Sequence, residues 1–389
     1  MQDKINSNNK NKIDFKNRIY GGGLASFLSA LMAIILGLVF GFLVMLIAIP
    51  ENALMGFRYV AFGGFNRIGD VFYFATPILM TGLSVGFAFK MGLFNIGASG
   101  QYTMGMFFAL YVGFMWKLPP SIHWIVAILA GAVGGMLWGF IPGVFKALLN
   151  VNEVITSIMF NYIGMYLVDM MIQRSSTMYK FDQTRTNYLP SSVQIPALTT
   201  NSNVNLGIIL AIAIGILLYI ILKKTTFGYE LKATGFNKFA SEYAGMKGKK
   251  NIIITMVIAG ALSGIGGAFA ILAPSAIAGS SMTYEPINII ASNGFTGIAV
   301  ALLGSSHPIG IIFSSVFISH IQRGGTLASL VGYKPEIIDV VVAVIIYFSA
   351  FAMVMNEALA RFIKSRTGKG HDDKITGDKV SNNNIKEAE

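Results

Sequence analysis

The amino-acid sequence predicts an all-α, polytopic membrane protein, and three observations carry that prediction. The 389 residues are 54% hydrophobic with a mean hydropathy of +0.63, and only 12% of them are charged, about half the share found in soluble domains. Apolar runs of roughly 20 residues, the length that an α-helix needs to cross about 30 Å of hydrocarbon, recur along the chain. Between Asn251 and Gln322, Glu285 is the only acidic or basic side chain.

These apolar runs predict about ten transmembrane helices. They are Leu24–Pro50, Val71–Ala88, Gly97–Met115, Ile122–Leu148, Val154–Ile172, Asn205–Leu222, Ile252–Ala273, Ile289–Leu303, Pro308–Gln322 and Glu336–Met355. The third and eighth runs are short or interrupted by glycine, so either is a candidate for a broken or re-entrant element. Such elements need protein or water around them, because backbone amides and carbonyls that face lipid would stay unpaired.

Lysine and arginine residues predict the orientation of the chain. Five lie before residue 20, seven between Lys223 and Lys250, and seven between Arg361 and Lys386. Because basic residues gather in the cytoplasmic loops and tails of membrane proteins, both termini are expected in the cytoplasm. We expect a basic tail at 1–23, a transmembrane domain at 24–360 with a cytoplasmic loop at 223–250, and a disordered cytoplasmic tail at 361–389. The same distribution argues against nucleic acid as a partner.

Two polar, glycine-bearing stretches interrupt the hydrocarbon at comparable places in the two halves of the chain. They are FNIGASGQYTMG (Phe94–Gly105) and SNGFTGIAVALLGSSHPIG (Ser292–Gly310). Interrupted segments at corresponding positions suggest two pseudo-repeated halves with a pathway near their interface. The alternative is that these glycines only allow close helix packing. That role is assigned to other glycines, which recur every fourth residue on one helix face: Gly135, Gly139 and Gly143, and Gly260 with Gly264.

Residues that could carry catalysis are sparse. The chain has no cysteine, its four histidines are scattered without ligand spacing, and it contains no GxxxxGK[ST] phosphate-binding loop. No enzyme activity, metal or cofactor is therefore predicted. Glu153, Asp169 and Asp339 lie close to the ends of predicted spans. They are expected to be charges at headgroup level or at helix termini, with a proton or ion route as the alternative.

The loop Lys223–Lys250 contains a short amphipathic helix. Asn237 is a suitable N-cap and Gly245 a suitable residue just after the helix. Large apolar side chains recur on one face at three- and four-residue spacing: Phe236, Phe239, Tyr243 and Met246. This face must be buried somewhere, either in the lipid interface or in a groove on a partner protein, and physics alone leaves both open.

Four motifs together resemble a known family. They are GLFNIGASGQYTMG (Gly92–Gly105), NEVITSIMFNYIG (Asn152–Gly164), GFNKFASEYAGM (Gly235–Met246) and GFTGIAVALLGSSHPIG (Gly294–Gly310). They resemble the permease subunits of ABC importers of the branched-chain amino acid and simple sugar group. The second motif is similar to the nucleoside-import branch, whose permeases work with a Bmp-type nucleoside-binding lipoprotein. The likeness runs in order from about Thr76 to Phe362.

The resemblance implies a type II ABC importer permease in a prokaryotic plasma membrane. Two permeases, often paralogues, would form the pathway, two ABC ATPase subunits would drive it, and a substrate-binding lipoprotein would deliver substrate. The third motif would then be the segment that couples to the ATPase, with contacts from Gly235, Phe236, Phe239, Glu242, Tyr243, Gly245 and Met246. The sequence departs from the family at Ser99, where glutamate is common, at Lys238, where proline is common, and at Ser305, where a basic residue is common.

A nucleoside has a polar ribose, a flat base and no net charge, so a matching pathway needs amides, hydroxyls and aromatic or Met surfaces rather than a countercharge. The candidates are Asn95, Gln101, Thr156, Asn161, Tyr162 and Asn293. Each has an alternative role in hydrogen bonds between helices. Rival functions are import of ribose-type sugars or branched-chain amino acids by the same machine, ion-coupled transport through Asp169 or Asp339, and a membrane-embedded enzyme.

Overall fold

A computed structural model describes residues 23–199, 202–275 and 280–348. Residues 35–347 form one compact unit, and residues 23–34 and Phe348 belong to a second unit that includes both ends of the chain. The predictions for the tails 1–23 and 361–389 fall almost entirely outside the described residues.

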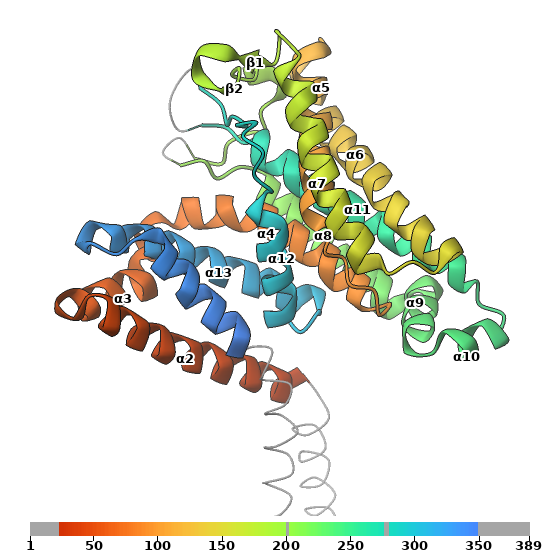
Figure 1. Cartoon of the computed structure of the whole chain (residues 1–389), viewed down its shortest axis with the longest axis horizontal. Coiled ribbons are helices and arrows are strands. Elements are labelled where there is room, and N and C mark those ends of the chain that lie inside the picture. Colours follow the sequence, from red (N-terminus) through yellow and green to blue (C-terminus); the bar gives the residue numbers. More distant parts are fainter. Residues whose placement is uncertain (1–22, 200–201, 276–279, 349–389) are drawn as a thin grey trace, which may run out of the picture. The chain divides into compact units, whose positions relative to one another are not determined.

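The described chain is built from helices, as predicted (Figure 1). The α-helices are α2 (Gly23–Ala48), α3 (Ala53–Phe62), α4 (Ile68–Phe89), α5 (Ala98–Met115), α6 (Pro120–Leu149), α7 (Glu153–Gln173), α8 (Gly207–Lys224), α9 (Thr226–Phe236), α10 (Lys238–Tyr243), α11 (Gly248–Ile271), α12 (Ser292–Leu303) and α13 (Pro308–Ala328). Residues 335–348 are also helical. Short 3-10 turns occur at η1 (Pro50–Asn52), η2 (Gly63–Arg67), η3 (Phe181–Gln183), η4 (Ser191–Val193) and η5 (Ser329–Val331).

Two short strands are present as well. Strand β1 (Tyr179–Lys180) pairs antiparallel with β2 (Arg185–Thr186), with Tyr179 opposite Thr186. They lie in the long connection between α7 and α8. This connection is tied to the segment after α11, because Ile195 N donates to Leu272 O at 2.9 Å. The hairpin and α10 therefore lie toward opposite ends of α11, which we call the β1–β2 end and the α10 end (Figure 1).

The helices carry the composition of a multi-pass membrane protein. Within the described residues, five helical stretches are long and apolar enough to cross a membrane: Pro50–Phe89, Pro120–Leu149, Glu153–Gln173, Gly207–Lys224 and Gly248–Ile271. Helix α12 has 12 residues and rises only about 18 Å, so it cannot cross alone, as its glycine-rich sequence predicted. The sequence analysis missed α3, and the total of ten crossings stays a prediction.

Helices α6 and α11 pack backbone against backbone, and glycines make this close contact possible. A Cβ added to Gly135 of α6 would lie 2.8 Å from Gly264 Cα and against Gly260 O in α11. Gly139 meets the same helix, where an added Cβ would lie 3.1 Å from Gly260 Cα. This confirms the packing role predicted for these glycines, because any side chain would force the two backbones apart.

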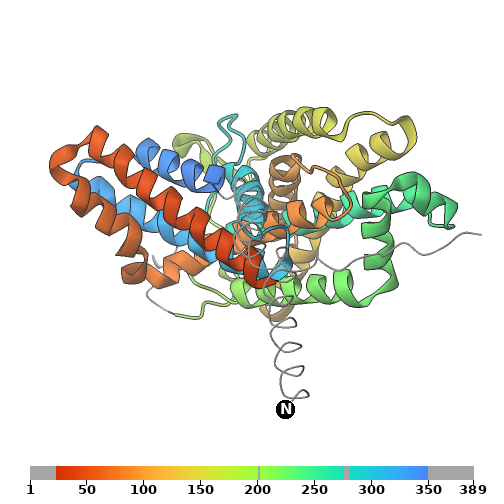
Figure 2. The same ribbon diagram turned by 90° about the horizontal axis from the view of Figure 1, so that it is seen from below.

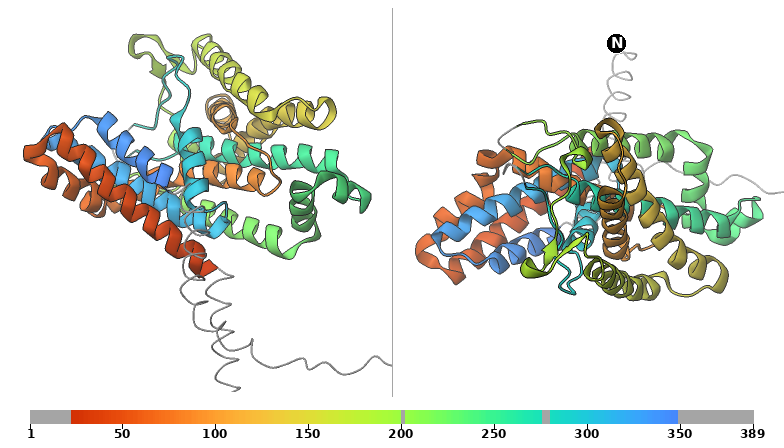
Figure 3. Two further views of the ribbon diagram at one scale, coloured as in Figure 1. Left: turned by 60° about the horizontal axis from the view of Figure 1, so that its bottom comes forward. Right: turned by 90° about the horizontal axis from the view of Figure 1, so that it is seen from above.

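Helix α4 lies between α11 on one side and α12 with α13 on the other (Figure 3). Its glycines again set the spacing: a Cβ added to Gly82 would lie 2.9 Å from Val300 Cγ1 of α12. The Thr81 hydroxyl donates to Asn293 O across the same contact, at 2.9 Å. Most of α4 is buried, so the short helix α12 has protein rather than lipid on this side.

The N-terminal and C-terminal parts of the compact unit meet at α2. Within this unit, residues 35–48 of α2 (red) run beside the helical residues 335–347 (blue) in two views (Figures 2 and 3). Gly37 faces Ile345 and Gly41 faces Val341, and an added Cβ on either would clash. The Tyr333 hydroxyl lies 3.0 Å from Met45 O and 2.8 Å from Ile49 O, which fixes the end of α2.

We expect Gly135→Ala to destabilise the protein, because the new methyl group meets backbone rather than a movable side chain. Forcing extra volume into a packed contact costs about 1–3 kcal/mol. The measurement is the melting temperature of the detergent-purified protein, which should fall by several degrees. Val133→Leu, on the exposed side of the same helix, is the matched control and should leave the melting temperature unchanged. An unchanged value for Gly135→Ala would contradict the assignment.

Candidate functional site

The two polar, glycine-bearing stretches lie against each other in the structure. Ser99, in the first turn of α5, donates its hydroxyl to Ala291 O at 3.0 Å, just before α12. Asn293 Nδ2 donates to the Tyr102 hydroxyl at 2.8 Å. Gly294 packs directly on Ser99, where a Cβ on the glycine would lie 2.5 Å from Ser99 Cα. The structure therefore joins the starts of α5 and α12, two segments that the sequence separates by almost 200 residues.

Two of the predicted pathway residues form a closed pair. Asn95 Nδ2 donates to Gln101 Oε1 at 2.9 Å, and Gln101 Nε2 donates back to Asn95 Oδ1 at 3.1 Å. Asn95 also reaches Ser84 Oγ of α4 at 3.0 Å. The two side chains are 0% and 1% exposed. Their amide groups therefore join α4 to the first turn of α5, which is the structural alternative considered for them.

Asn161 fixes the same turn of α5 from the side of α7. Its Oδ1 accepts from Gly100 N at 2.8 Å, and its Nδ2 donates to Ile96 O at 3.0 Å. The Thr156 hydroxyl donates locally, to the carbonyls of the N-cap residue Asn152 and of Glu153. Of the six predicted pathway residues, Tyr162 and Asn293 keep exposed surface. Contact of any of the six with substrate stays a prediction.

Asp169 has a role that sequence reasoning missed. Its side chain is buried, 2% exposed, rather than at headgroup level. The Tyr284 hydroxyl donates to Asp169 Oδ1 at 2.6 Å, and Asn288 N donates to Oδ2 at 2.7 Å. One turn further along α7, Gln173 Nε2 donates to Pro286 O at 2.9 Å. Asp169 thus anchors the segment 284–288, which leads into α12.

In this anchor, the Asp169 carboxylate accepts hydrogen bonds from two neutral donors, the Tyr284 hydroxyl and Asn288 N. Burial, and next the hydrogen bond to Asp169, raise the pKa of Tyr284 above its ordinary value, so the phenol keeps its proton. Asn288 adopts φ +58°, a left-handed conformation that asparagine tolerates better than most residues. Asp169 and Tyr284 are 115 residues apart and no sequence motif links them, which is why the contact could not be predicted.

The other two acidic candidates behave as expected for charges near span ends. Glu153, at the start of α7, forms an ion pair with Lys146 Nζ at 2.8 Å. Asp339 is exposed. Among the residues that the structure describes, no group of three His, Asp or Glu side chains gathers as metal ligands do.

The amphipathic segment folds as its capping residues predicted. Asn237 Oδ1 accepts from Ala240 N at 3.0 Å, and Gly245 has φ +84°. Phe236, Phe239 and Tyr243 are 97%, 83% and 99% exposed. Their apolar face is therefore uncovered by any described part of the chain. The preceding helix α9 was not predicted, although its N-cap Thr225, which accepts from Gly228 N at 3.1 Å, was the available signal.

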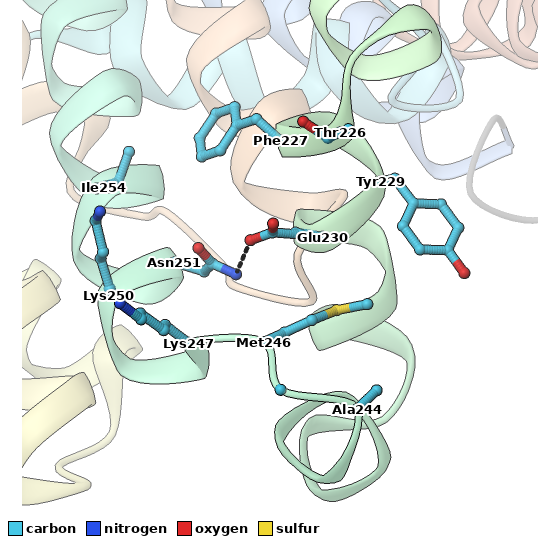
Figure 4. Close-up of a pocket in the computed structure, with 11 residues that line it drawn as sticks. Thr226, Phe227, Tyr229, Glu230, Ala244, Met246, Lys247, Lys250, Asn251 and Ile254 are labelled. Carbon is cyan, nitrogen blue, oxygen red and sulfur yellow. Dashed lines mark hydrogen bonds between the residues drawn. The ribbon is translucent and has the colours of Figure 1, made fainter.

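A pocket of about 580 Å³ opens between α9, the connection 244–247 that follows α10, and the start of α11 (Figure 4). Tyr229, Met246 and Lys247 line it, together with Glu230 and Asn251, whose side chains are 3.5 Å apart. Basic groups gather at this α10 end. Burial and then Lys232 lower the pKa of Lys90, while burial followed by Lys223 and Lys90 lowers that of His307. Each of these groups therefore lies in a field of positive charge.

The described residues have the features of a membrane transport subunit. They form a multi-pass bundle with a buried polar junction and an uncovered amphipathic helix, and no catalytic groups gather within them. The chain belongs to the family described as branched-chain amino acid transport system / permease component, whose model matches residues 67–350. It is thus a permease component rather than an enzyme, and a multi-pass membrane protein.

Curated relatives agree with this family. The chain is 36% identical to the guanosine ABC transporter permease protein NupP of Bacillus subtilis, over 88% of this chain and 98% of that protein. It is 37% identical to the nucleoside ABC transporter permease protein NupB of Lactococcus lactis, over 85% and 92%. A more distant relative, at 26% identity over 69% and 84%, is the guanosine ABC transporter permease protein NupQ of B. subtilis. No solved structure matches the chain.

We expect Asp169→Ala to destabilise the protein, because it leaves the Tyr284 hydroxyl and Asn288 N without their acceptor. Each unsatisfied buried group costs about 1–3 kcal/mol. Asp169→Asn, which keeps one acceptor oxygen, should recover part of the loss. The melting temperature of the purified protein is the measurement. Asp182→Ala, at an exposed position in the hairpin, is the control. Equal values for Asp169→Ala and the control would contradict the anchoring role.

Proposed function

We propose that this chain is the permease subunit of an ATP-driven importer that moves nucleosides, guanosine among them, across the cell membrane. The observation that carries the proposal is the likeness to NupP and NupB, which spans nearly the whole of both relatives. The chemistry of the chain agrees with a neutral cargo. Along α7, Glu153 is ion-paired and Asp169 is hydrogen-bonded, so neither carboxylate offers a free countercharge.

The partner permease is a paralogue of this chain. B. subtilis has both NupP and NupQ, and L. lactis has both NupB and NupC, and all four resemble this chain. The identities of 36% and 37% with the first of each pair exceed those of 26% and 25% with the second. This pattern supports two non-identical permeases in one transporter, with this chain in the place of NupP and NupB.

Helix α10 couples the permease to the ATPase subunits. Phe239 and Tyr243 of α10, and Phe236 at the end of α9, are nearly fully exposed, and an apolar face of that kind is stable only against a partner or a lipid surface. The caps at Asn237 and Gly245 make the segment rigid enough to transmit a displacement. The pocket lined by Met246 makes the adjoining surface concave. A protein partner can fill such a hollow, whereas a flat lipid interface does not require one.

The α10 end faces the cytoplasm, and so do both termini. Lys90, Lys223 and Lys232 supply positive charge at this end, which is the side that basic residues mark in membrane proteins. The β1–β2 end then faces outward, where a substrate-binding lipoprotein delivers nucleoside. An ion-coupled mechanism is less well supported, because both oxygens of the buried Asp169 carboxylate already accept hydrogen bonds from the segment 284–288.

Uptake in cells that express the complete transporter tests the substrate and the energy source. We expect radiolabelled guanosine to accumulate, ribose and leucine to stay at background, and accumulation to vanish when the lysine of the ATPase phosphate-binding loop is replaced. Guanosine uptake that survives this ATPase mutation but collapses with an uncoupler would overturn the ABC mechanism. Uptake of leucine or ribose in place of guanosine would overturn the nucleoside assignment.

Substitution of the exposed aromatic face tests the coupling role. Phe239→Asp is expected to reduce co-purification of the ATPase at least tenfold, because a carboxylate replaces an apolar anchor. The permease should still insert and fold. Phe181→Asp is the matched control, because Phe181 is also exposed, at 71% against 83% for Phe239, but lies at the β1–β2 end; it should co-purify normally. Normal recovery of the ATPase with Phe239→Asp would contradict the coupling role of α10.

A further inference from the structure

One face of α7 is large, apolar to aromatic, and uncovered. Met159, Tyr162 and Tyr166 are 57%, 48% and 56% exposed, and Met170 continues the row. They recur at three- and four-residue spacing, so they share one side of the helix. The opposite side of α7 packs on α5 and α6, where Asn161 and Gly164 are buried. We call Met159, Tyr162, Tyr166 and Met170 the Tyr/Met face.

Lipid is a poor occupant for this face. Tyr162 lies near the middle of the 21-residue helix, and in a helix of that length the middle is about 15 Å from either end, deep in the hydrocarbon. Tyrosine in membrane proteins favours the interfaces, where its hydroxyl reaches water or headgroups. Within the described residues, neither the Tyr162 nor the Tyr166 hydroxyl has a hydrogen-bond partner. A phenol without a partner in hydrocarbon is costly, so these hydroxyls require water, protein or ligand.

The Asp169 anchor relates this face to the start of α12. Asp169 follows Tyr162 by seven residues and Tyr166 by three, so it lies on the same side of α7 near the β1–β2 end. The segment 284–288 that it holds therefore borders the Tyr/Met face at that end. The same segment continues to Ala291 and Asn293, which contact Ser99 and Tyr102 of α5. The face thus borders the junction of the two glycine-bearing stretches.

Its chemistry fits an uncharged, flat, hydroxylated molecule. The face has no charged side chain, its phenols offer both donors and acceptors, and its rings and methionine sulfurs offer polarisable surface. We propose that the Tyr/Met face of α7 lines the translocation path and contacts the nucleoside directly. The phenols bind ribose or base edges, and the rings and methionines contact the base. The inference rests on the proposed function and adds Met159, Tyr166 and Met170 to the residues that determine specificity.

The absence of cysteine from the 389-residue sequence makes the test direct. Single cysteines are introduced as Met159→Cys and Tyr166→Cys, and the assembled transporter in sealed vesicles is exposed to a charged, membrane-impermeant methanethiosulfonate. Leu217→Cys in α8 is the matched lipid-side control, since Leu217 is 54% exposed near the middle of an apolar helix. Asp182→Cys in the exposed hairpin is the positive control.

We expect both α7 cysteines to be modified, guanosine to slow their modification at least threefold, and the Leu217→Cys protein to stay unmodified. Unmodified α7 cysteines beside a reactive hairpin cysteine would place the face in lipid and overturn the proposal. Disulfide cross-linking of either cysteine to one in the second permease, without guanosine protection, would make the face a subunit contact and also overturn it. Guanosine uptake measured in the same vesicles tests the proposed function separately, because water access at Met159 and Tyr166 does not depend on which nucleoside is carried.

Discussion

The backbone contact between α6 and α11 is the constraint on which the rest of the structure depends. Gly135 and Gly139 on one helix meet Gly260 and Gly264 on the other, and no side chain separates them. In a membrane the hydrophobic effect does not hold helices together, so close van der Waals packing has to supply much of the attraction. Helix α5 packs on both members of this pair, where Gly105 meets Gly264. The position of α5 therefore follows from the glycine contact.

Polar side chains then fix particular turns and loops against neighbouring helices. Asn95, Gln101 and Asn161 tie the first turn of α5 to α4 and α7, and Asp169 ties α7 to the segment before α12. A buried carboxamide or carboxylate must find partners, since an unpaired polar group in this environment is costly. Each of these groups has found them in backbone or side chains of a neighbouring segment. The junction between α5 and α12 is accordingly defined by hydrogen bonds, while the helix bundle around it is defined by packing.

Two of the regions that lack such partners are the ones to which we assign function. The aromatic face of α10 is uncovered at one end of the molecule, and the Tyr/Met face of α7 is uncovered along the span. In both places large side chains are exposed although the surrounding sequence buries others of the same kind. A permease must meet an ATPase and a substrate, and uncovered faces of suitable chemistry are where such contacts form.

The sequence by itself determined the helical, multi-pass class, the glycine faces of α6 and α11, and the capped helix at Asn237, because periodicity, composition and capping are local properties. It also indicated that Ser292–Gly310 is a short, interrupted element. Only the tertiary structure decided which polar residues are consumed by partners. Asn95 and Gln101 bond to each other, and Asp169 bonds to Tyr284, which follows it by more than 100 residues. The sequence does not show such contacts directly, since they result from how the helices pack, and so Tyr166 became a candidate only when the uncovered side of α7 was known.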